Sequence, residues 1–124
     1  MSSIKIFHNA YYEYDDEIDA LLIHNKKEYI YDSSIELDQD IILDYDHNGI
    51  PVAIELLNTS KIFKVPKNSL KTIDNIRIYV KITEESILLE LNFDVCFDNK
   101  KQKCSFDSLK PNNIPLPHIE LKVT

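Results

Sequence analysis

The chain has 124 residues, of which 44% are hydrophobic, and 21 acidic against 14 basic side chains give it a net charge of −7. This length suits one compact domain, and the hydrophobic content is too high for a disordered chain. The negative charge argues against nucleic-acid binding, because neutralising phosphates needs a surplus of lysine and arginine. It suits solubility, cations or a basic protein partner instead.

Strand-like alternation of apolar and polar residues runs through the first half of the chain. An acidic turn at 15–17 separates the first two strand candidates, and two Asp- and Asn-rich turns separate later ones. The expected strands cover residues 12–14, 20–24, 29–37, 41–47 and 50–57. Short turns of this kind are typical of antiparallel strands.

A change of texture after Asn58 marks a connector. Pro66 stands where proline favours the first turn of a helix, and Leu70 and Ile73 lie three residues apart on one face. We therefore expect one short helix over residues 66–73.

The second half returns to strand-like alternation. Residues 76–82 and 87–97 are expected to pair, and residues 104–106 to return beside the second of them. Three prolines make 110–117 a loop, and 118–123 is expected to close the sheet as an edge strand. The prediction is a mainly β fold in one compact domain, 1–124, made of a meander (11–61), a connector with a short helix (62–75) and a β-rich C-terminal half (76–124).

The run from Asp44 to Glu55 matches the calcium-loop pattern D-x-[DN]-x-[DN]-G-x5-E. An EF-hand needs amphipathic helices on both sides of that loop, and neither flank shows a helical stripe. Pro51 also occupies a loop position where the EF-hand backbone donates a hydrogen bond. We therefore reject the EF-hand.

A β-hairpin explains the same residues better. A two-residue type I′ turn at Asn48-Gly49 pairs His47 with Ile50, Tyr45 with Val52, Leu43 with Ile54 and Ile41 with Leu56. The other face pairs Asp46 with Pro51, Asp44 with Ala53 and Ile42 with Glu55. This register predicts that Leu43, Tyr45, Val52 and Ile54 face inward and that Asp44 and Asp46 face outward.

Asp44 and Asp46 lie two residues apart on one predicted strand and so share a face. Hard cations prefer several carboxylate oxygens, which makes the pair a candidate calcium or magnesium site. The alternative is a solvated acidic face with no ligand.

The sequence gives little support to catalysis. His8, His24, His47 and His118 are scattered, the serines lack the glycines of a nucleophile elbow, and a single glycine argues against a phosphate-binding loop. Cys96 and Cys104 flank a turn near 98–102, where only an odd-length loop would place them opposite each other. Because cytosolic conditions keep thiols reduced, two free thiols are expected, with a disulfide as the alternative. We expect no enzyme and no cofactor.

The start of the chain lacks the charged and apolar regions of a secretion signal. No apolar run reaches the roughly 18 residues needed to span a bilayer. We expect a cytoplasmic protein without a membrane partner.

Three motifs in order resemble the family called domain of unknown function 2283. They are Tyr14 to Ile23 (YDDEIDALLI), Glu36 to Asp46 (ELDQDIILDYD) and Gly49 to Ser60 (GIPVAIELLNTS), and together they cover about residues 11–61. The chain departs from the family pattern at Asp16, Pro51 and Ala53. Residues 74–124 lie outside this core and resemble the additional β region of longer archaeal members.

The resemblance implies an antiparallel meander followed by a small helix, and it supplies no catalytic residues. Some members are encoded beside a small RNase-like toxin, which implies an antitoxin role. We therefore expect a non-enzymatic, acidic protein-interaction module, antitoxin-like against a basic RNase-type partner. The alternative is a divalent-cation (calcium) binding protein that uses Asp44 and Asp46. Unprotected strand edges also suit a homodimer.

Overall fold

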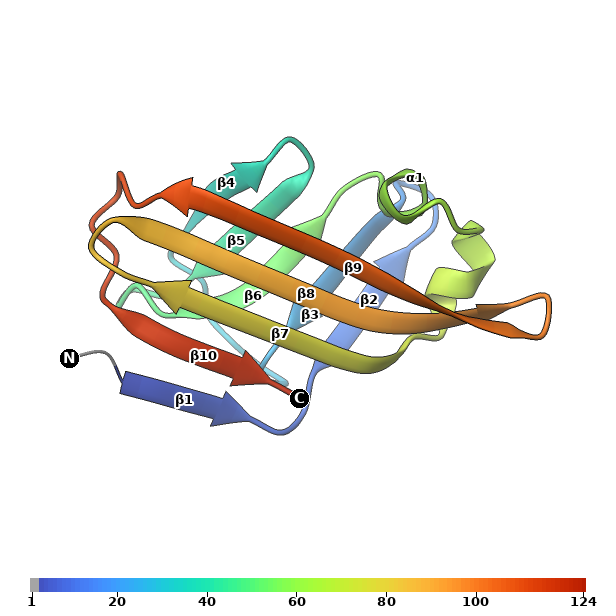
Figure 1. Ribbon diagram of the computed structural model, residues 1–124, viewed down its shortest axis with the longest axis horizontal. Coiled ribbons are helices and arrows are strands. Elements are labelled where there is room, and N and C mark those ends of the chain that lie inside the picture. Colours follow the sequence, from blue (N-terminus) through green and yellow to red (C-terminus); the bar gives the residue numbers. More distant parts are fainter. Residues whose placement is uncertain (1–2) are drawn as a thin grey trace.

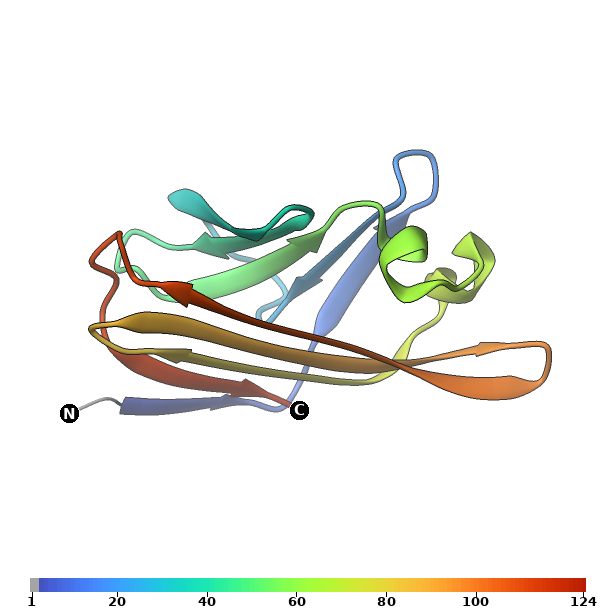
Figure 2. The same cartoon turned by 45° about the horizontal axis from the view of Figure 1, so that its top comes forward.

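The computed structural model describes residues 3–124 and consists mainly of two stacked five-stranded sheets (Figures 1 and 2). The N-terminal sheet has the order β2-β3-β6-β5-β4 and is antiparallel throughout. Its strands are β2 (Tyr11–Asp15), β3 (Ala20–His24), β4 (Ser33–Asp38), β5 (Ile41–Tyr45) and β6 (Pro51–Leu56). The mainly β fold and the antiparallel pairing are confirmed, except that residues 29–32 form a loop rather than the start of β4. The predicted meander connectivity is wrong, because β6 rather than β4 lies beside β3.

The C-terminal sheet has the order β1-β10-β7-β8-β9. Its strands are β1 (Ser3–Phe7), β7 (Asp74–Ile82), β8 (Ser86–Phe97), β9 (Lys100–Pro111) and β10 (Ile119–Val123). The prediction of an edge strand at 118–123 is wrong, because β10 lies between β7 and β1 and pairs in parallel with β1. The C-terminal strands therefore form a second sheet instead of extending the first.

Apolar side chains from both sheets form one continuous core between them. Leu21, Ile23 and Leu43 contribute from the N-terminal sheet, and Leu89 and Leu91 from the C-terminal sheet. The alternation predicted for 87–97 is confirmed, since its apolar positions from 89 to 95 are buried. Burying this surface supplies the main driving force for folding.

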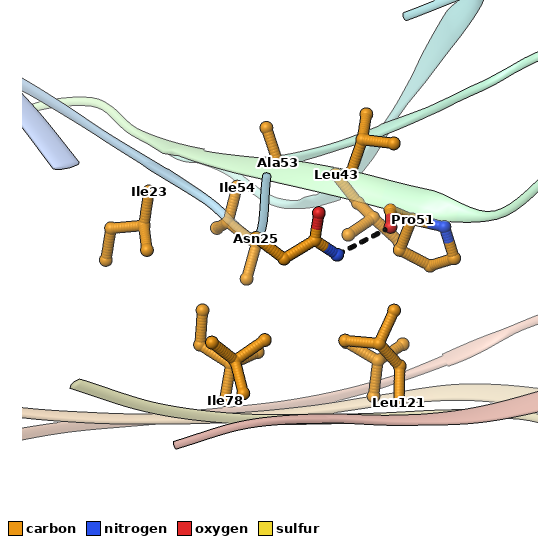
Figure 3. A pocket seen from close by; sticks show the side chains of 11 residues that line it. Ile23, Asn25, Leu43, Pro51, Ala53, Ile54, Ile78 and Leu121 are labelled. Atoms are coloured by element: carbon orange, nitrogen blue, oxygen red, sulfur yellow. Dashed lines mark hydrogen bonds between the residues drawn. The ribbon is translucent and has the colours of Figure 1, made fainter. Parts of the chain in front are cut away.

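A cavity of about 10 Å³ lies between the sheets near the end of β3 (Figure 3). Asn25 points into this layer, and its Nδ2 donates a hydrogen bond to the Pro51 carbonyl oxygen at 3.1 Å. Its Oδ1 is buried and has no hydrogen-bond partner among the described residues. Aliphatic side chains, including Ile23, Leu43 and Ile54, line the rest of the cavity, which is therefore almost wholly apolar.

The β5–β6 hairpin has the predicted register over most of its length but a different turn. Ile41, Leu43 and Asp44 pair with Leu56, Ile54 and Ala53 as expected. Among turn residues 46–50, only Gly49 has a positive φ, at 77°, and its N–H donates a hydrogen bond to the Asp46 carbonyl oxygen. This is a three-residue loop rather than the type I′ turn at Asn48-Gly49.

The longer loop changes the pairing beside it. Tyr45 pairs with Pro51 instead of Val52, and the unpaired Val52 forms a bulge that restores the predicted register further along. Val52 is buried as expected, whereas Tyr45 is only half-buried.

Two short helices follow β6 and close one end of the sandwich, α1 (Thr59–Phe63) and the 3₁₀ helix η1 (Lys67–Lys71). The second confirms the short helix expected over 66–73, whereas α1 was not predicted. Phe63 of α1 packs edge-on against Phe93 of β8, with ring centroids 5.0 Å apart. The helices are therefore anchored to the core of the C-terminal sheet.

The long β8–β9 hairpin contains the turn expected near 98–102, and the turn itself is confined to Asp98 and Asn99. Asp98 and Asn99 both have positive φ, and Phe97 pairs with Lys100, which makes a two-residue turn. In this register Cys96 lies opposite Lys101 and Cys104 opposite Phe93. The two cysteines are free, and burial raises the pKa of the Cys104 thiol to about 11.

Candidate interaction face

Charge is divided very unevenly between the two halves of the molecule. Residues 12–60, which contain the N-terminal sheet, carry 13 acidic and two basic side chains. The rest of the chain carries eight acidic and 12 basic side chains. Such an asymmetry produces a negative potential over the N-terminal sheet.

Cross-strand pairing arranges the outer face of the N-terminal sheet in two rows that run across all five strands. The row next to the loop of residues 25–32 is the covered row, and it consists of Tyr11, His24, Ala53, Asp44 and Ser34. The neighbouring row is the open row, and it consists of Glu13, Leu22, Glu55, Ile42 and Glu36. Both rows point away from the core, because the alternate residues of the same strands are buried in it.

The loop of residues 25–32 packs on the covered row. The Tyr29 ring lies 5.2 Å from the His24 ring, which stacks on Tyr11 at 5.6 Å. Asp44 is only 3% exposed, and its Oδ1 accepts a hydrogen bond from the Ser34 hydroxyl at 2.6 Å. Burial, followed by repulsion from Asp44 and Glu55, raises the pKa of Tyr29. The polar and aromatic side chains of the covered row therefore already have partners within the chain.

The open row remains accessible. Glu13 and Glu36 are exposed, while Leu22, Ile42 and Glu55 between them are half-buried. Within residues 3–124, none of the three glutamates forms an ion pair with a lysine or arginine. The row thus alternates unpaired acids with aliphatic side chains.

Glu55 at the centre of the open row is an unusual carboxyl group. Burial, a hydrogen bond with Asp44 and repulsion from Asp44 raise its pKa to about 7. A hydrogen bond between two carboxyl groups needs a proton on one of them. Near neutral pH Glu55 is therefore partly protonated, and a cation beside it would favour its ionised form.

The predicted metal ligands Asp44 and Asp46 have separate roles in the structure. Asp44 points away from the core as predicted but is buried beneath the loop, so the expectation that it is solvent-facing is wrong. The Asp46 carboxylate accepts hydrogen bonds from the backbone N–H groups of Asn48 and Ile50, at 2.9 and 3.0 Å. Among the described residues, no group of three His, Cys, Asp or Glu side chains could hold a metal ion.

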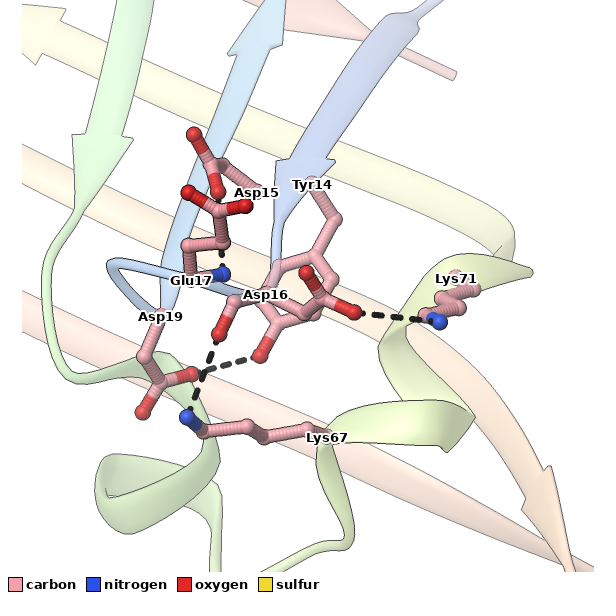
Figure 4. Close-up of polar contacts among 7 residues, drawn as sticks. All are labelled: Tyr14, Asp15, Asp16, Glu17, Asp19, Lys67 and Lys71. Carbon is pink, nitrogen blue, oxygen red and sulfur yellow. Dashed lines mark hydrogen bonds and ion pairs between the residues drawn. The ribbon is translucent and has the colours of Figure 1, made fainter.

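A polar cluster at the other end of the N-terminal sheet explains two of the sequence motifs (Figure 4). The Asp19 carboxylate accepts hydrogen bonds from the Tyr14 hydroxyl and from the N–H and hydroxyl of Ser60, at 2.7, 3.0 and 2.7 Å. Burial raises the pKa of Asp19, but these hydrogen bonds outweigh it and hold the pKa below its usual value. We call this arrangement the Asp19 clamp, and it joins the β2–β3 turn to the start of α1.

Neither the open row nor the Asp19 clamp was predicted from the sequence. The acidic cluster at 15–19 was visible, but Asp16 turns outward to pair with Lys71 at 3.1 Å, whereas Asp19 turns inward. The open row depends on the strand order β2-β3-β6-β5-β4, which differs from the order of the strands along the chain and could not be predicted from it. Cross-strand pairing of neighbours along the chain would have placed only Ile42 beside Glu55.

Comparison with known proteins identifies relatives over the same region and beyond. The family described as "Protein of unknown function (DUF2283)" matches residues 12–60. A protein of Methanosarcina mazei named "Putative hypoxanthine phosphoribosyltransferase" is 37% identical over 108 residues, which cover 86% of this chain and 85% of that protein. The uncharacterized protein MJ0789 of Methanocaldococcus jannaschii is 40% identical over 80 residues, which cover 64% of this chain and 67% of that protein.

No solved structure matches this chain. Among the described residues, no helix is long and apolar enough to cross a membrane.

Proposed function

We propose that this chain, which belongs to the DUF2283 family of proteins of unknown function, is a non-enzymatic interaction module that binds a basic protein partner. The open row carries the proposal, since it presents three glutamates that form no ion pair with any basic side chain within residues 3–124. Charged and apolar groups left together on a surface are typical of a binding site. The neighbouring loop adds two exposed apolar side chains, Ile30 and Tyr31.

The antitoxin-like form of this proposal names a small ribonuclease as the partner. A protein that binds RNA carries a surplus of lysine and arginine, so an acidic face can cover its substrate-binding surface. The excess of acidic side chains over residues 12–60 supplies the complementary charge. Long-range attraction between such surfaces also accelerates association.

The name of the Methanosarcina relative suggests a different, enzymatic function. Phosphoribosyl transfer requires a site for a pyrophosphate group, which proteins commonly hold with glycine-rich backbone loops. Gly49 is the one glycine in this sequence, and it lies in a tight turn where any added Cβ would clash with the Pro117 ring. The residues of this chain therefore favour the binding function.

Calcium binding by Asp44 and Asp46 is the alternative proposal. Titration calorimetry with millimolar calcium tests it directly. Heat that disappears in Asp44→Asn and Asp46→Asn would support a site there, and no heat would remove the proposal.

Growth rescue tests the main proposal. The genes beside that of this chain are searched for one that encodes a small basic protein; the chain is co-expressed with that protein, and growth and co-purification are measured. We expect rescue and a stable complex, and the double change Glu13→Lys and Glu36→Lys should weaken both because it reverses the charge of the open row. Toxicity that co-expression never relieves, with no complex, would contradict the proposal.

A further inference from the structure

The spacing within the open row identifies the kind of segment that fits it, provided that the row binds a basic protein as proposed above. Neighbouring strands in a sheet lie about 4.8 Å apart. Glu13, Glu55 and Glu36 stand on β2, β6 and β4, which are separated by one strand each time. Successive glutamates are therefore about 10 Å apart, and the whole row is about 19 Å long.

The aliphatic members of the row fall midway between the glutamates. Leu22 on β3 separates Glu13 from Glu55, and Ile42 on β5 separates Glu55 from Glu36. The row thus repeats acid and apolar positions at intervals of about 5 Å. A partner needs basic groups every 10 Å or so, with apolar groups between them and on the same side.

An α-helix meets this requirement. Seven residues of helix span about 10.5 Å and return to nearly the same face, and three or four residues span about 5 Å on that face. In an extended strand, three residues also span about 10 Å, but side chains three apart point to opposite sides. A strand laid across the row therefore cannot present basic groups at the required spacing.

We propose that the open row binds an amphipathic α-helix laid across the strands, with lysine or arginine every seven residues and apolar side chains three or four residues between them. Three basic positions require about 15 residues, or about 21 Å of helix, which matches the length of the row. The basic side chains meet Glu13, Glu55 and Glu36, and the apolar ones meet Leu22 and Ile42.

Glu55 makes this contact sensitive to pH. It faces Leu22 from β3, Ile42 and Asp44 from β5, and Tyr29 from the loop, with Glu13 and Glu36 at either end of its row. A lysine or arginine beside Glu55 favours the ionised carboxylate, so binding releases the proton from Glu55. Binding therefore strengthens as the pH rises from 6 to 8.

Two synthetic peptides of identical composition test the helix. In the first, lysines recur every seven residues with leucines three or four residues between them, and in the second, lysines recur every five residues and so spread around the helix. Each is labelled with a fluorophore and titrated with the full chain, and anisotropy reports binding. We expect the first peptide to bind about tenfold more tightly, because only it aligns three charge pairs and two apolar contacts.

Matched variants locate the contact. The double change Glu13→Gln and Glu36→Gln should weaken the first peptide roughly threefold to tenfold. Glu84→Gln with Glu85→Gln removes the same charge from the exposed β7–β8 turn and should leave binding nearly unchanged. Glu55→Gln should abolish the rise in affinity between pH 6 and 8.

Each outcome bears on the inference. Equal binding of the two peptides, or equal loss in both double variants, would overturn the helix while leaving a non-specific acidic face that still supports the proposed function. Absence of binding to either peptide, combined with growth rescue by the chain, would show that the partner binds another surface. Absence of binding and of rescue would overturn both proposals.

Discussion

The outer faces of the two sheets handle charge in opposite ways. On the C-terminal sheet, acidic and basic side chains alternate and contact one another. Glu120 of β10 lies 4.0 Å from Lys81 and accepts a hydrogen bond from the Tyr79 hydroxyl, and Lys122 lies over the Tyr79 ring. On the outer face of the N-terminal sheet, carboxyl groups contact one another, and within residues 3–124 none of them has a cationic partner.

The charged side chains of the C-terminal sheet therefore find partners within the chain, whereas the carboxyl groups of the N-terminal sheet do not find cationic partners within residues 3–124. Paired surface charges cost little, and a row of unpaired acids weakens the folded state through repulsion. Because both sheets bury their inner faces in the same core, packing does not explain the difference. A binding role for the open row does explain it, and changes to each sheet can test that account.

Phe93→Ala has the largest expected effect. The Phe93 ring is fully buried and packs against Phe63 of α1, so its removal should lower the free energy of unfolding by about 3–5 kcal/mol. The shared core predicts that both sheets lose protection together in native-state hydrogen exchange, as expected of one domain spanning 1–124. Loss of protection confined to the C-terminal sheet would show two separate folding units.

Asp19→Ala should be the next most damaging change. It removes three hydrogen bonds to a buried carboxylate and leaves the Tyr14 and Ser60 donors without their acceptor, which should cost about 2–3 kcal/mol. Asp16→Ala is the matched control in the same turn. It removes only an exposed ion pair with Lys71 and should lower the free energy of unfolding by roughly a few tenths of a kcal/mol. Urea unfolding of both variants measures the difference, and equal losses would contradict the Asp19 clamp.

Alternation predicted most of the strands because each buries one side, and that period appears directly in residues such as Leu89, Leu91 and Phe93. The β5–β6 register was predictable for the same reason, since Leu43 and Ile54 must both reach the core. The turn was not predictable, because Asn-Gly suits both two- and three-residue loops, and the bulge at Val52 absorbs the difference.

The rest of the structure depends on partners far apart in the sequence. Strand β1 pairs with the last strand of the chain, and Ser60, the second residue of α1, donates its N–H to Asp19, 41 residues earlier. The candidate site has the same origin, since Glu13, Glu55 and Glu36 share a row only through the order β2-β3-β6-β5-β4. No local pattern encodes these contacts, and the calcium-like motif drew attention to Asp46, which stabilises its own turn.

Glu55→Gln should change how stability depends on pH. The folded-state pKa of Glu55 is raised from 4.5 to about 7, so the unfolded chain ionises first and the wild-type protein loses stability between these two pH values. Solvent screens part of the repulsion, so we expect a loss of about 1–2 kcal/mol. Glutamine does not titrate, and the variant should therefore be more stable than wild type at pH 8 and similar to it at pH 4.

Urea titrations followed by circular dichroism from pH 4 to 8 measure this difference. Glu90→Gln is the control, because Glu90 is an exposed glutamate of the C-terminal sheet. A Glu55→Gln profile parallel to that of the wild type would show that Glu55 does not hold a proton near neutral pH.

The smallest expected effects have opposite signs on the two sheets. Glu36→Gln relieves repulsion along the open row and should raise the free energy of unfolding by roughly a few tenths of a kcal/mol. Lys81→Gln breaks the ion pair with Glu120 and should lower it by a similar amount. Because salt screens exposed charges, both effects should shrink between about 0.02 and 0.5 M sodium chloride, as measured by urea midpoints. If both variants changed stability with the same sign, repulsion between the acidic side chains would not be destabilising the N-terminal sheet. The unpaired glutamates would then give no energetic reason to expect a basic partner.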